Sequence, residues 1–296
     1  MLITIFTATY KGANLLTKLF ESLMRQTNKD FEWILVNDGS PDNTDEIVEK
    51  MQAKANFPLH YFKKENGGKT TAVNLGIQKA IGDLWLSVDH DDFLSEDAVE
   101  VINQNYPKIK DNKEICSITF LRHHHNGTPI GTQKNPDNLV SDFCSYRTVH
   151  KITGDRAEVV KTDNYREFCP IPTFSDENNC LDGYIWLMLA KKYKTLFIAN
   201  EKPLYFCEYL QTGRSSVGTY STPRGNMVEN NLYASMYPVP VLQKLRAYNR
   251  YWQAFFVAKN YKFGTAFNML LHKWGIIVLP VGFLVFCYKK LLKRTA

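Results

Sequence analysis

No aspartate or glutamate follows Glu229 in this chain of 296 residues. The same tail carries ten lysines and arginines, which leaves the first 229 residues with 26 basic side chains against 30 acidic ones, a net charge of −4. A segment that is basic without any acid is attracted to anionic surfaces, such as nucleic acid or a lipid bilayer. The tail therefore predicts an anionic partner, and its other features decide which one.

Paired cysteines are lacking as well. The six cysteines show no CxxC pair and no regular spacing, which argues against both a zinc site and a disulfide framework. Scattered thiols are typical of a reducing compartment. The N-terminus lacks the basic region and the long apolar core of a signal peptide, and the chain has no internal repeat. We therefore expect a folded protein in the cytoplasm.

Apolar runs of strand length alternate with helical patterns in the first part of the chain. The strand candidates lie at 2–8, 31–36, 59–62 and 84–88, and apolar residues at helical spacing follow within 15–23, 47–51, 72–80 and 98–102. This alternation indicates βαβ units, and hence an α/β fold with a mainly parallel, mixed sheet flanked by helices. Further on, the pattern is less regular, with strands expected at 115–121 and 195–198 and a helix at 184–192.

Polar clusters follow three of the predicted strands. In an open parallel sheet, ligands bind at the carboxyl ends of the strands, so these clusters are expected to form one site. They are Thr7-Ala8-Thr9-Tyr10, Asn37-Asp38-Gly39-Ser40 and Asp89-His90-Asp91-Asp92.

Two of the motifs suggest chemistry on their own. The acidic cluster at 89–92 offers hard oxygen ligands, which suit Mg²⁺ or Mn²⁺ rather than zinc. The alternative is a solvated acidic turn before the next helix. Asn66-Gly67-Gly68-Lys69 combines close backbone approach with a cation at a helix start, which suits a phosphate, although a glycine pair alone is usually just a turn.

Taken together and in this order, the motifs resemble the family 2 glycosyltransferases, which have the GT-A nucleotide-sugar fold. The similarity is strong over about 1–105 and weak over 150–215. The matching pieces are Thr7 to Tyr10, Trp33 to Thr44, Asn66 to Lys69 with Ala72, Asn74 and Gly76, and Val88 to Asp92.

The resemblance implies a domain plan and a reaction. Residues 1–225 would form the catalytic domain, with 1–105 binding the nucleotide-sugar and 106–225 binding the acceptor, and 226–296 would form a helical tail. The reaction would move a sugar from a nucleotide-sugar, expected to be a UDP-sugar, to an acceptor hydroxyl with inversion, assisted by Mn²⁺ or Mg²⁺.

The resemblance also assigns roles to individual residues. Thr7, Ala8 and Tyr10 would line the base pocket, and Asp38 would hydrogen-bond the base. Lys69 would lie near the base and the phosphates. Asn37 stands where many relatives have aspartate, so it receives no charge-based role. The acidic motif would contact the ribose or donor sugar through Asp89 and His90 and would hold the metal through Asp91 and Asp89, with Asp92 in a supporting position.

The general base is expected in the second half, where relatives carry an acid a few residues before a tryptophan. Asp182, ahead of Trp186, fits this pattern, with Asp176 and Glu177 as alternatives. The simpler interpretation of Asp182 is a charge at a helix N-terminus. Arg214 lies where relatives have a loop that closes over the donor, and it would either touch the diphosphate or be a solvated loop charge.

The histidine run at 123–125 looks like a metal site, but consecutive strand residues point to opposite faces, so a surface loop is expected.

The end of the tail is apolar and flanked by bases. Residues 275–288 are uncharged, with Lys273 and Trp274 before them and four bases in 289–294. The run is short for a membrane span and contains Pro280, so we expect a segment lying in the membrane surface. A long aliphatic run contributes nothing to phosphate contacts, which disfavours nucleic acid. The alternatives are a helix packed on the catalytic domain or a dimer contact.

These features predict a peripheral enzyme on the inner face of the cell membrane, acting on a glycan or lipid-linked acceptor. Two other classes are a family member that binds a nucleotide-sugar or a partner without turnover, and a sugar nucleotidyltransferase. The latter needs a glycine-rich basic loop after the first strand, for which Thr9-Tyr10-Lys11-Gly12 is a poor substitute.

Overall fold

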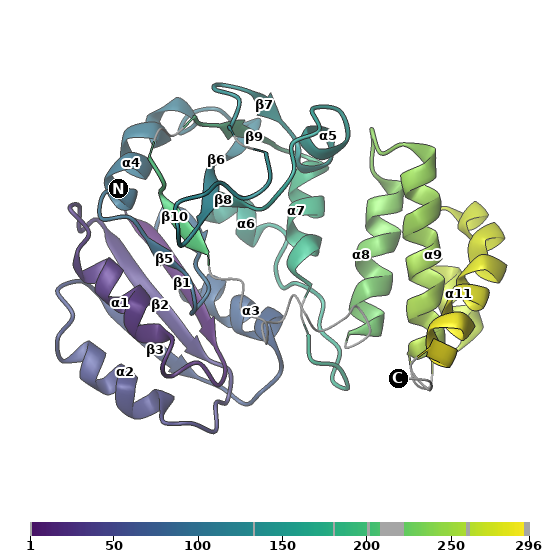
Figure 1. The fold of residues 1–296 in the computed structure, drawn as a ribbon, viewed down its shortest axis with the longest axis horizontal. Helices are drawn as coiled ribbons and strands as arrows, with labels where there is room; N and C mark the ends of the chain where they lie inside the picture. Colours follow the sequence, from purple (N-terminus) through teal and green to yellow (C-terminus); the bar gives the residue numbers. More distant parts are fainter. Residues whose placement is uncertain are drawn as a thin grey trace.

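The computed structural model describes residues 2–132, 134–179, 181–199, 202–207, 222–258 and 261–292. A mixed β-sheet with helices on both faces forms the body, and a group of helices lies to one side of it (Figure 1). The predicted α/β class is therefore confirmed.

The first part of the chain follows the predicted alternation of strands and helices. Strand β1 pairs in parallel with both β2 and β4, and β2 pairs in parallel with β3. These strands end in register at one edge of the sheet, where Thr9 lies opposite Asn37. The elements are β1 (Ile3–Thr9), α1 (Leu16–Met24), β2 (Phe31–Asn37), α2 (Thr44–Gln52), β3 (Leu59–Lys63), α3 (Lys69–Lys79) and β4 (Leu84–Ser87).

The second part of the chain adds to the sheet an antiparallel strand that the sequence did not predict. Strand β8 lies between β4 and β6 and is antiparallel to both, so the strand order is β3-β2-β1-β4-β8-β6-β10-β5. Strand β9 pairs with β6 and β7 at the side. The elements are β5 (Phe93–Leu94), α4 (Ala98–Asn105), β6 (Ile115–His124), β7 (Val140–Ser141), α5 (Phe143–Thr148), β8 (Arg156–Lys161), α6 (Thr162–Arg166), α7 (Asp182–Ala190), β9 (Lys194–Phe197) and β10 (Tyr205–Cys207).

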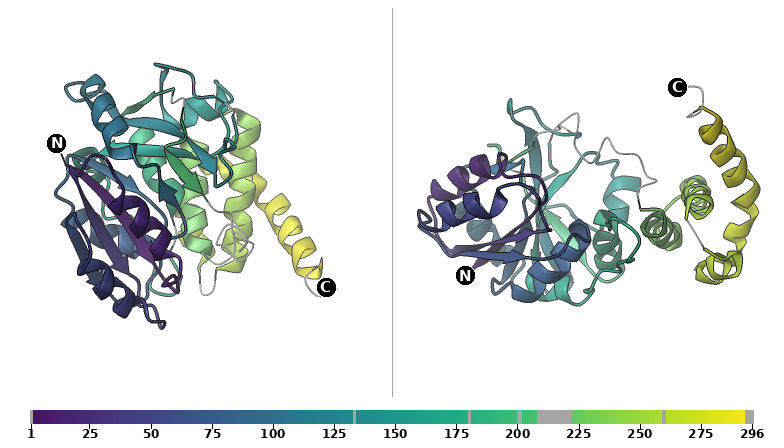
Figure 2. Two further views of the ribbon diagram at one scale, coloured as in Figure 1. Left: turned by 60° about the vertical axis from the view of Figure 1, so that its left-hand side comes forward. Right: turned by 90° about the horizontal axis from the view of Figure 1, so that it is seen from below.

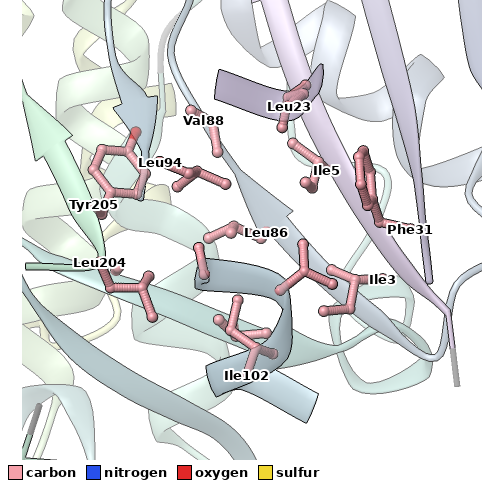
Figure 3. Close-up of a cluster of buried hydrophobic side chains, with 14 of the residues drawn as sticks. Ile3, Ile5, Leu23, Phe31, Leu86, Val88, Leu94, Ile102, Leu204 and Tyr205 are labelled. Atoms are coloured by element: carbon pink, nitrogen blue, oxygen red, sulfur yellow. The ribbon is translucent and has the colours of Figure 1, made fainter. Parts of the chain in front are cut away.

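Both faces of the sheet are covered, which explains why its strands read as continuous apolar runs. One core lies between the sheet and helices α1, α2 and α4, and it includes Ile3, Ile5 and Ile102 (Figure 3). The other core lies between the sheet and helices α3, α6 and α7, and it includes Phe6 and Trp85. Neighbouring residues of β1 thus serve opposite cores, as the period of a strand requires.

The prediction that the histidine run forms a surface loop is wrong for its first two residues. Strand β6 continues to His124, and His123 is buried. The reason is the parallel pairing with β10, which places Phe206 beside His123 and Cys207 beside His124. That pairing joins segments more than eighty residues apart, so no local pattern indicates it.

A half-buried acid on β8 gives the fold a pH dependence. Glu158 accepts a hydrogen bond from the Tyr146 hydroxyl (3.3 Å), and burial raises the pKa of Glu158 to about 7. An unfolded glutamate titrates near about 4.3. The native protein therefore binds an extra proton between these values, and its stability falls as the pH rises through that interval.

We expect the melting temperature to fall between about pH 5 and about pH 8, and Glu158→Gln to remove part of that fall. At the upper pH the variant should melt above the native protein, by about 2–4 °C for each kcal/mol gained. Glu114→Gln, at a side chain that is 77% exposed, is the control and should keep the native slope. A native slope in Glu158→Gln would contradict the prediction.

The helical tail is confirmed, and it begins before the predicted boundary. Helix α8 spans residues 225 and 226 without a break and packs on α7, where Leu232 meets Leu187. Helices α9 and α11 pack outward from α8 in turn (Figure 2). The tail consists of α8 (Pro223–Ser235), α9 (Val241–Val257), α10 (Phe263–Met269), a 3₁₀ turn (Lys273–Val278) and α11 (Leu279–Leu292).

Helix α11 is apolar and largely uncovered. Lys273–Leu291 has the length and composition to cross a membrane, with a mean hydropathy of 1.6, so the expectation that the run is too short for a span is wrong. Pro280 is the second residue of α11, where a proline costs no helical hydrogen bond. Gly282 allows the close approach to α9, because a Cβ there would lie 2.6 Å from the Cβ of Trp252.

Candidate active site

The predicted site lies at the carboxyl edge of strands β1, β2 and β4. Their parallel pairing brings the three polar clusters to one edge of the sheet, as the sequence predicted. The Thr7 hydroxyl ties two of them together, because it donates to the carbonyl of Val88 (2.8 Å) and accepts from the Trp33 indole (3.0 Å). The start of the acidic segment is therefore fixed to β1.

The predicted base-pocket residues differ in exposure. Thr7 is fully buried and its hydroxyl is bonded to Val88 and Trp33, so it exposes no group to a ligand. Ala8 is half-buried. Tyr10 is 40% exposed, with the Lys11 ammonium 5.3 Å from its ring centroid. Of the three, Tyr10 offers an open aromatic face on which a base could stack.

Asp38 holds the glycine loop in place. Its carboxylate accepts hydrogen bonds from the backbone N–H groups of Gly67 (3.0 Å) and Gly68 (2.7 Å) and pairs with the Lys64 ammonium (2.7 Å). Gly68 has φ +92°, and a Cβ there would lie 2.4 Å from the carbonyl oxygen of Asn179. The loop thus needs both the carboxylate and the glycine, a role of Asp38 that the sequence did not indicate.

Removing this carboxylate should destabilise the protein. We expect Asp38→Ala to lower the free energy of unfolding by about 1–3 kcal/mol, because buried N–H groups lose their acceptor. Urea denaturation measures the loss. Asp163→Ala is the matched control, since that side chain is 95% exposed and should change stability by less than about 0.5 kcal/mol. Equal losses in the two variants would contradict the anchoring role.

The acidic cluster is balanced by Lys69 at the start of α3. The Lys69 ammonium lies 2.7 Å from Asp89 Oδ1. Burial alone would raise the pKa of Asp89, but the charge and hydrogen bond of Lys69 outweigh it and lower that pKa to about 2. Burial and the charge of Asp89 raise the pKa of Asp91, and the same two causes raise the pKa of Asp92 to about 7.

A second cation, Arg122, lies behind the cluster and was missed by the sequence analysis. Its guanidinium lies 4.2 Å from the ring centroid of Tyr205, whose hydroxyl donates to Asp92 (2.7 Å). Burial would lower the pKa of Arg122, but Tyr205, Cys207, Asp92 and Asp89 outweigh it and raise that pKa well above its usual range. One arginine at the end of a strand carries no motif, so no local signal could have found it.

The donor set suits Mg²⁺ or Mn²⁺ held jointly with a diphosphate. Asp89 and Asp91 supply oxygen ligands, and a cation would relieve the repulsion that raises the pKa of Asp91. The buried Nδ1 of His90 has no hydrogen-bond partner among the described residues. In that part of the chain no group of three or more His, Cys, Asp or Glu side chains could hold a metal ion. Mg²⁺ is usually bound by one or two carboxylates and substrate phosphates, so the partial set fits.

Asp182, the predicted base, lies beside this cluster. It is the first residue of α7, its side chain is 63% exposed, and its Oδ1 lies 3.9 Å from the Lys69 ammonium. Lys69 therefore contacts the acidic cluster and the start of α7 at once. The donor half and the acceptor half of the predicted domain meet at this lysine.

The two alternative acids have other partners. Glu177 is 4% exposed, and its carboxylate accepts the backbone N–H groups of Arg224 (2.7 Å) and Gly225 (3.2 Å) at the start of α8. Asp176 forms an ion pair with the Arg224 guanidinium. Both acids contact the start of α8, although the Asp176 side chain is 59% exposed; Asp182 is 63% exposed and lies beside Lys69.

The segment before α7 is fastened to the glycine loop. The carbonyl of Asn179 accepts from the Thr70 N–H (3.1 Å), the Asn179 amide donates to the Gly67 carbonyl (3.0 Å), and the Thr70 hydroxyl accepts from the Leu181 N–H (2.8 Å). These bonds fix where α7 begins. Arg214 and the rest of its predicted closing loop, 209–215, lie outside the described residues.

Comparisons with known proteins agree on one family. The model of glycosyl transferase family 2 matches residues 4–170. An uncharacterized glycosyltransferase of Rickettsia typhi is 36% identical over 114 residues, which is 38% of this chain and 34% of that protein. Chondroitin synthase of Pasteurella multocida is 34% identical over 121 residues, which is 41% of this chain and 12% of that protein.

A solved structure extends the likeness over nearly the whole chain. S. aureus TarS 1-349 in complex with UDP-GlcNAc has a TM-score of 0.62 and 17% identity, over 95% of this chain and 79% of that one. At this identity the likeness concerns the fold. The curated relatives above are longer, and the chain spans about a third of their length or less.

Proposed function

The chain belongs to glycosyl transferase family 2, and from this membership we propose that it transfers a sugar from a nucleotide-sugar to an acceptor hydroxyl with inversion. The observation that carries the proposal is the position of Lys69, 2.7 Å from Asp89 and 3.9 Å from Asp182. It joins the acidic cluster, suited to a metal diphosphate, to an exposed acid suited to proton transfer.

In the proposed reaction Asp182 takes the proton of the acceptor hydroxyl as that oxygen attacks the anomeric carbon. Its side chain is exposed, so an acceptor can reach it. A general base contributes about 10²–10⁴-fold to such a step. Lys69 holds Asp89 in place and adds a positive charge where the leaving diphosphate gains negative charge. Asp91 and Asp89 would hold Mn²⁺ or Mg²⁺, which when bound supplies further charge stabilisation to the leaving group.

We propose a UDP-sugar as the donor. Tyr10 is open for stacking on the base, while Asp38 and the glycine loop border the same edge of the sheet. A structure of similar fold, that of S. aureus TarS, was determined with UDP-GlcNAc.

Thermal shifts with UDP, GDP, CMP and dTDP, each with Mn²⁺ and then with EDTA, test the donor site. We expect UDP with Mn²⁺ to stabilise the protein by about 2.7 kcal/mol at a hundredfold excess over Kd, and EDTA to remove most of the shift. A larger thermal shift with another of these nucleotides would identify that nucleotide, rather than UDP, as the one carried by the donor. If no nucleotide stabilised the protein, the donor site would be degenerate and the transferase proposal would be rejected.

For the acceptor we propose a glycan or lipid-linked glycan at the inner face of the cell membrane. The support comes from the tail, where α11 exposes Val281, Leu284 and Leu291 to 50–66% and carries Lys289 and Lys290 in its last turn. An apolar helix face next to bases is typical of proteins that lie on an anionic lipid surface.

A further inference from the structure

A cavity of about 190 Å³ opens in the tail between helices α8, α9 and α11. Its lining includes none of the residues assigned to the site at the sheet edge, and α8, which contributes Asn226 to its wall, packs on α7. Its polar lining contains cations and amides and no acid: Arg246, Arg250 and Lys289, with Asn226, Asn249 and Gln253.

The lining is built by one face of α9. Arg246, Asn249, Arg250 and Gln253 follow at spacings of three, four and seven residues, so they share a helix face. The two arginines are four residues apart and repel each other. Among the described residues, neither guanidinium forms an ion pair or donates a hydrogen bond, and no acid follows Glu229 in the chain. In the described part of the chain, this face therefore holds two positive charges without a counter-ion.

The amides in the cavity are oriented by a chain of hydrogen bonds. The Lys289 ammonium donates to the Gln253 Oε1 (3.0 Å), and the Gln253 amide donates to the Asn249 Oδ1 (2.9 Å). Guanidinium groups match the oxygens of a phosphate in a two-pronged geometry. The chemistry that fits the cavity is thus a phosphate mono- or diester.

The neighbouring surface indicates where the phosphate comes from. Lys289 belongs to α11, whose residues Val281, Leu284, Tyr288 and Leu291 form an apolar stripe on one face and are 50–66% exposed. In the proposed surface location, α11 lies at the boundary between headgroups and acyl chains, which brings phosphates to the bases beside it. We propose that the cavity binds the phosphate of an anionic phospholipid while the stripe on α11 contacts the acyl chains. This inference rests on the proposed membrane location of the tail.

Sedimentation with vesicles of phosphatidylcholine, with and without phosphatidylglycerol, tests the proposal. The native chain should prefer the vesicles that contain phosphatidylglycerol, and Arg246→Gln/Arg250→Gln should lose most of this preference. The matched control is Lys244→Gln/Lys290→Gln, which removes the same charge from α9 and α11 outside the cavity. We expect the cavity variant to lose at least roughly tenfold more affinity than the control, whereas diffuse attraction weakens both equally. Equal losses of affinity in the two variants would overturn the proposal that the cavity binds the phosphate.

Inorganic phosphate separates the two sources of the ligand. Phosphate could raise the melting temperature of the native chain but not of Arg246→Gln/Arg250→Gln, while the native chain shows no preference for phosphatidylglycerol. That result would support a phosphate site in the cavity and contradict a phospholipid as its ligand. No response to either ligand would overturn the site itself. If the native chain bound neither kind of vesicle, the proposed membrane location would fail as well. An unchanged shift with UDP and Mn²⁺ shows that a variant is folded.

A separate observation concerns Glu229 on α8. Its Oε1 accepts the backbone N–H groups of Gly183 (2.9 Å) and Tyr184 (3.2 Å), in the first turn of α7 directly after Asp182. Burial, followed by the charge of Asp182, raises the pKa of Glu229 to about 7. Helix α8 of the tail thus contacts, at its middle, the helix turn that carries the proposed base.

We infer that Glu229 is a positioning residue for glycosyl transfer, which rests on the proposed role of Asp182. By accepting the two N–H groups, it fixes the first turn of α7 and so the distance from Asp182 to Lys69. Both bonds use one oxygen, so glutamine can make them and alanine cannot.

Steady-state kinetics of Glu229→Ala and Glu229→Gln test this inference. Alanine should lower kcat by about tenfold or more with little change in KM for the donor, because a small misplacement of a catalytic group is costly. Glutamine should restore kcat to within about threefold of the native value. A lower melting temperature with native kcat in Glu229→Ala would make Glu229 purely structural. If Asp182→Asn itself stayed active, the base assignment would fail first.

Discussion

Replacing Asp182 by asparagine is expected to reduce turnover by about 10²–10⁴-fold, because the variant has the same shape but cannot accept the acceptor's proton. Binding of UDP with Mn²⁺ should stay within about threefold of the native value. The nucleotide contacts are predicted at Tyr10 and Asp38, and on the donor side Asp182 lies 3.9 Å from the Lys69 ammonium. Release of UDP in the presence of acceptor measures turnover, and the thermal shift measures binding.

Two controls make the result specific. Asp176→Asn removes a nearby carboxylate that pairs with Arg224, and it should leave kcat largely intact. Asp182→Glu keeps the carboxylate but moves it, so it should show an intermediate kcat. If Asp182→Asn kept more than about a tenth of native turnover, Asp182 would not be the base, and Asp176 would become the candidate, since Glu177 is 4% exposed.

The parts of the fold that the sequence predicted are those set by local pattern. Strands β1 to β4 and the helices between them follow from short apolar runs and helical spacing, and the parallel pairing follows from their alternation. Strand β8 and the extension of β6 depend on pairing with β4 and β10, which are distant in sequence. A tertiary partner decided those elements, and the histidine run was misassigned for this reason.

The site divides in the same way. Motifs of adjacent residues located Asp38, Lys69 and the acidic cluster, because several polar residues in register at strand ends are recognisable together. Arg122 and Glu229 are single charged residues in otherwise ordinary elements, and only the folded chain brings them to Asp92 and to α7. From the sequence, Asp38 was predicted to hydrogen-bond the nucleobase, and its hydrogen bonds to the glycine loop were not predicted. Hydrogen bonds to backbone N–H groups leave no pattern in the side chains of a sequence.

Asp91→Asn is expected to weaken metal binding more than about 100-fold, beyond what the loss of an outer-shell partner costs. The Mn²⁺-dependent part of the shift with UDP should disappear, and turnover should fall with it, because the leaving diphosphate would lose its cation. Melting curves over a series of Mn²⁺ concentrations at fixed UDP measure the apparent affinity, and EDTA gives the metal-free baseline.

Asp92→Asn is the control that tells whether Asp91→Asn weakens metal binding by removing a ligand or merely by removing a negative charge. Asp92 is buried, accepts from the Tyr205 hydroxyl at 2.7 Å, and has a pKa raised to about 7 by burial and the charge of Asp89. An asparagine can keep that hydrogen bond, so this variant should retain Mn²⁺ affinity to within about tenfold if Asp92 only supports the loop. Equal losses in the two variants would mean that the cluster attracts the metal through its summed charge. A large loss in Asp92→Asn alone would move the ligand role from Asp91 to Asp92.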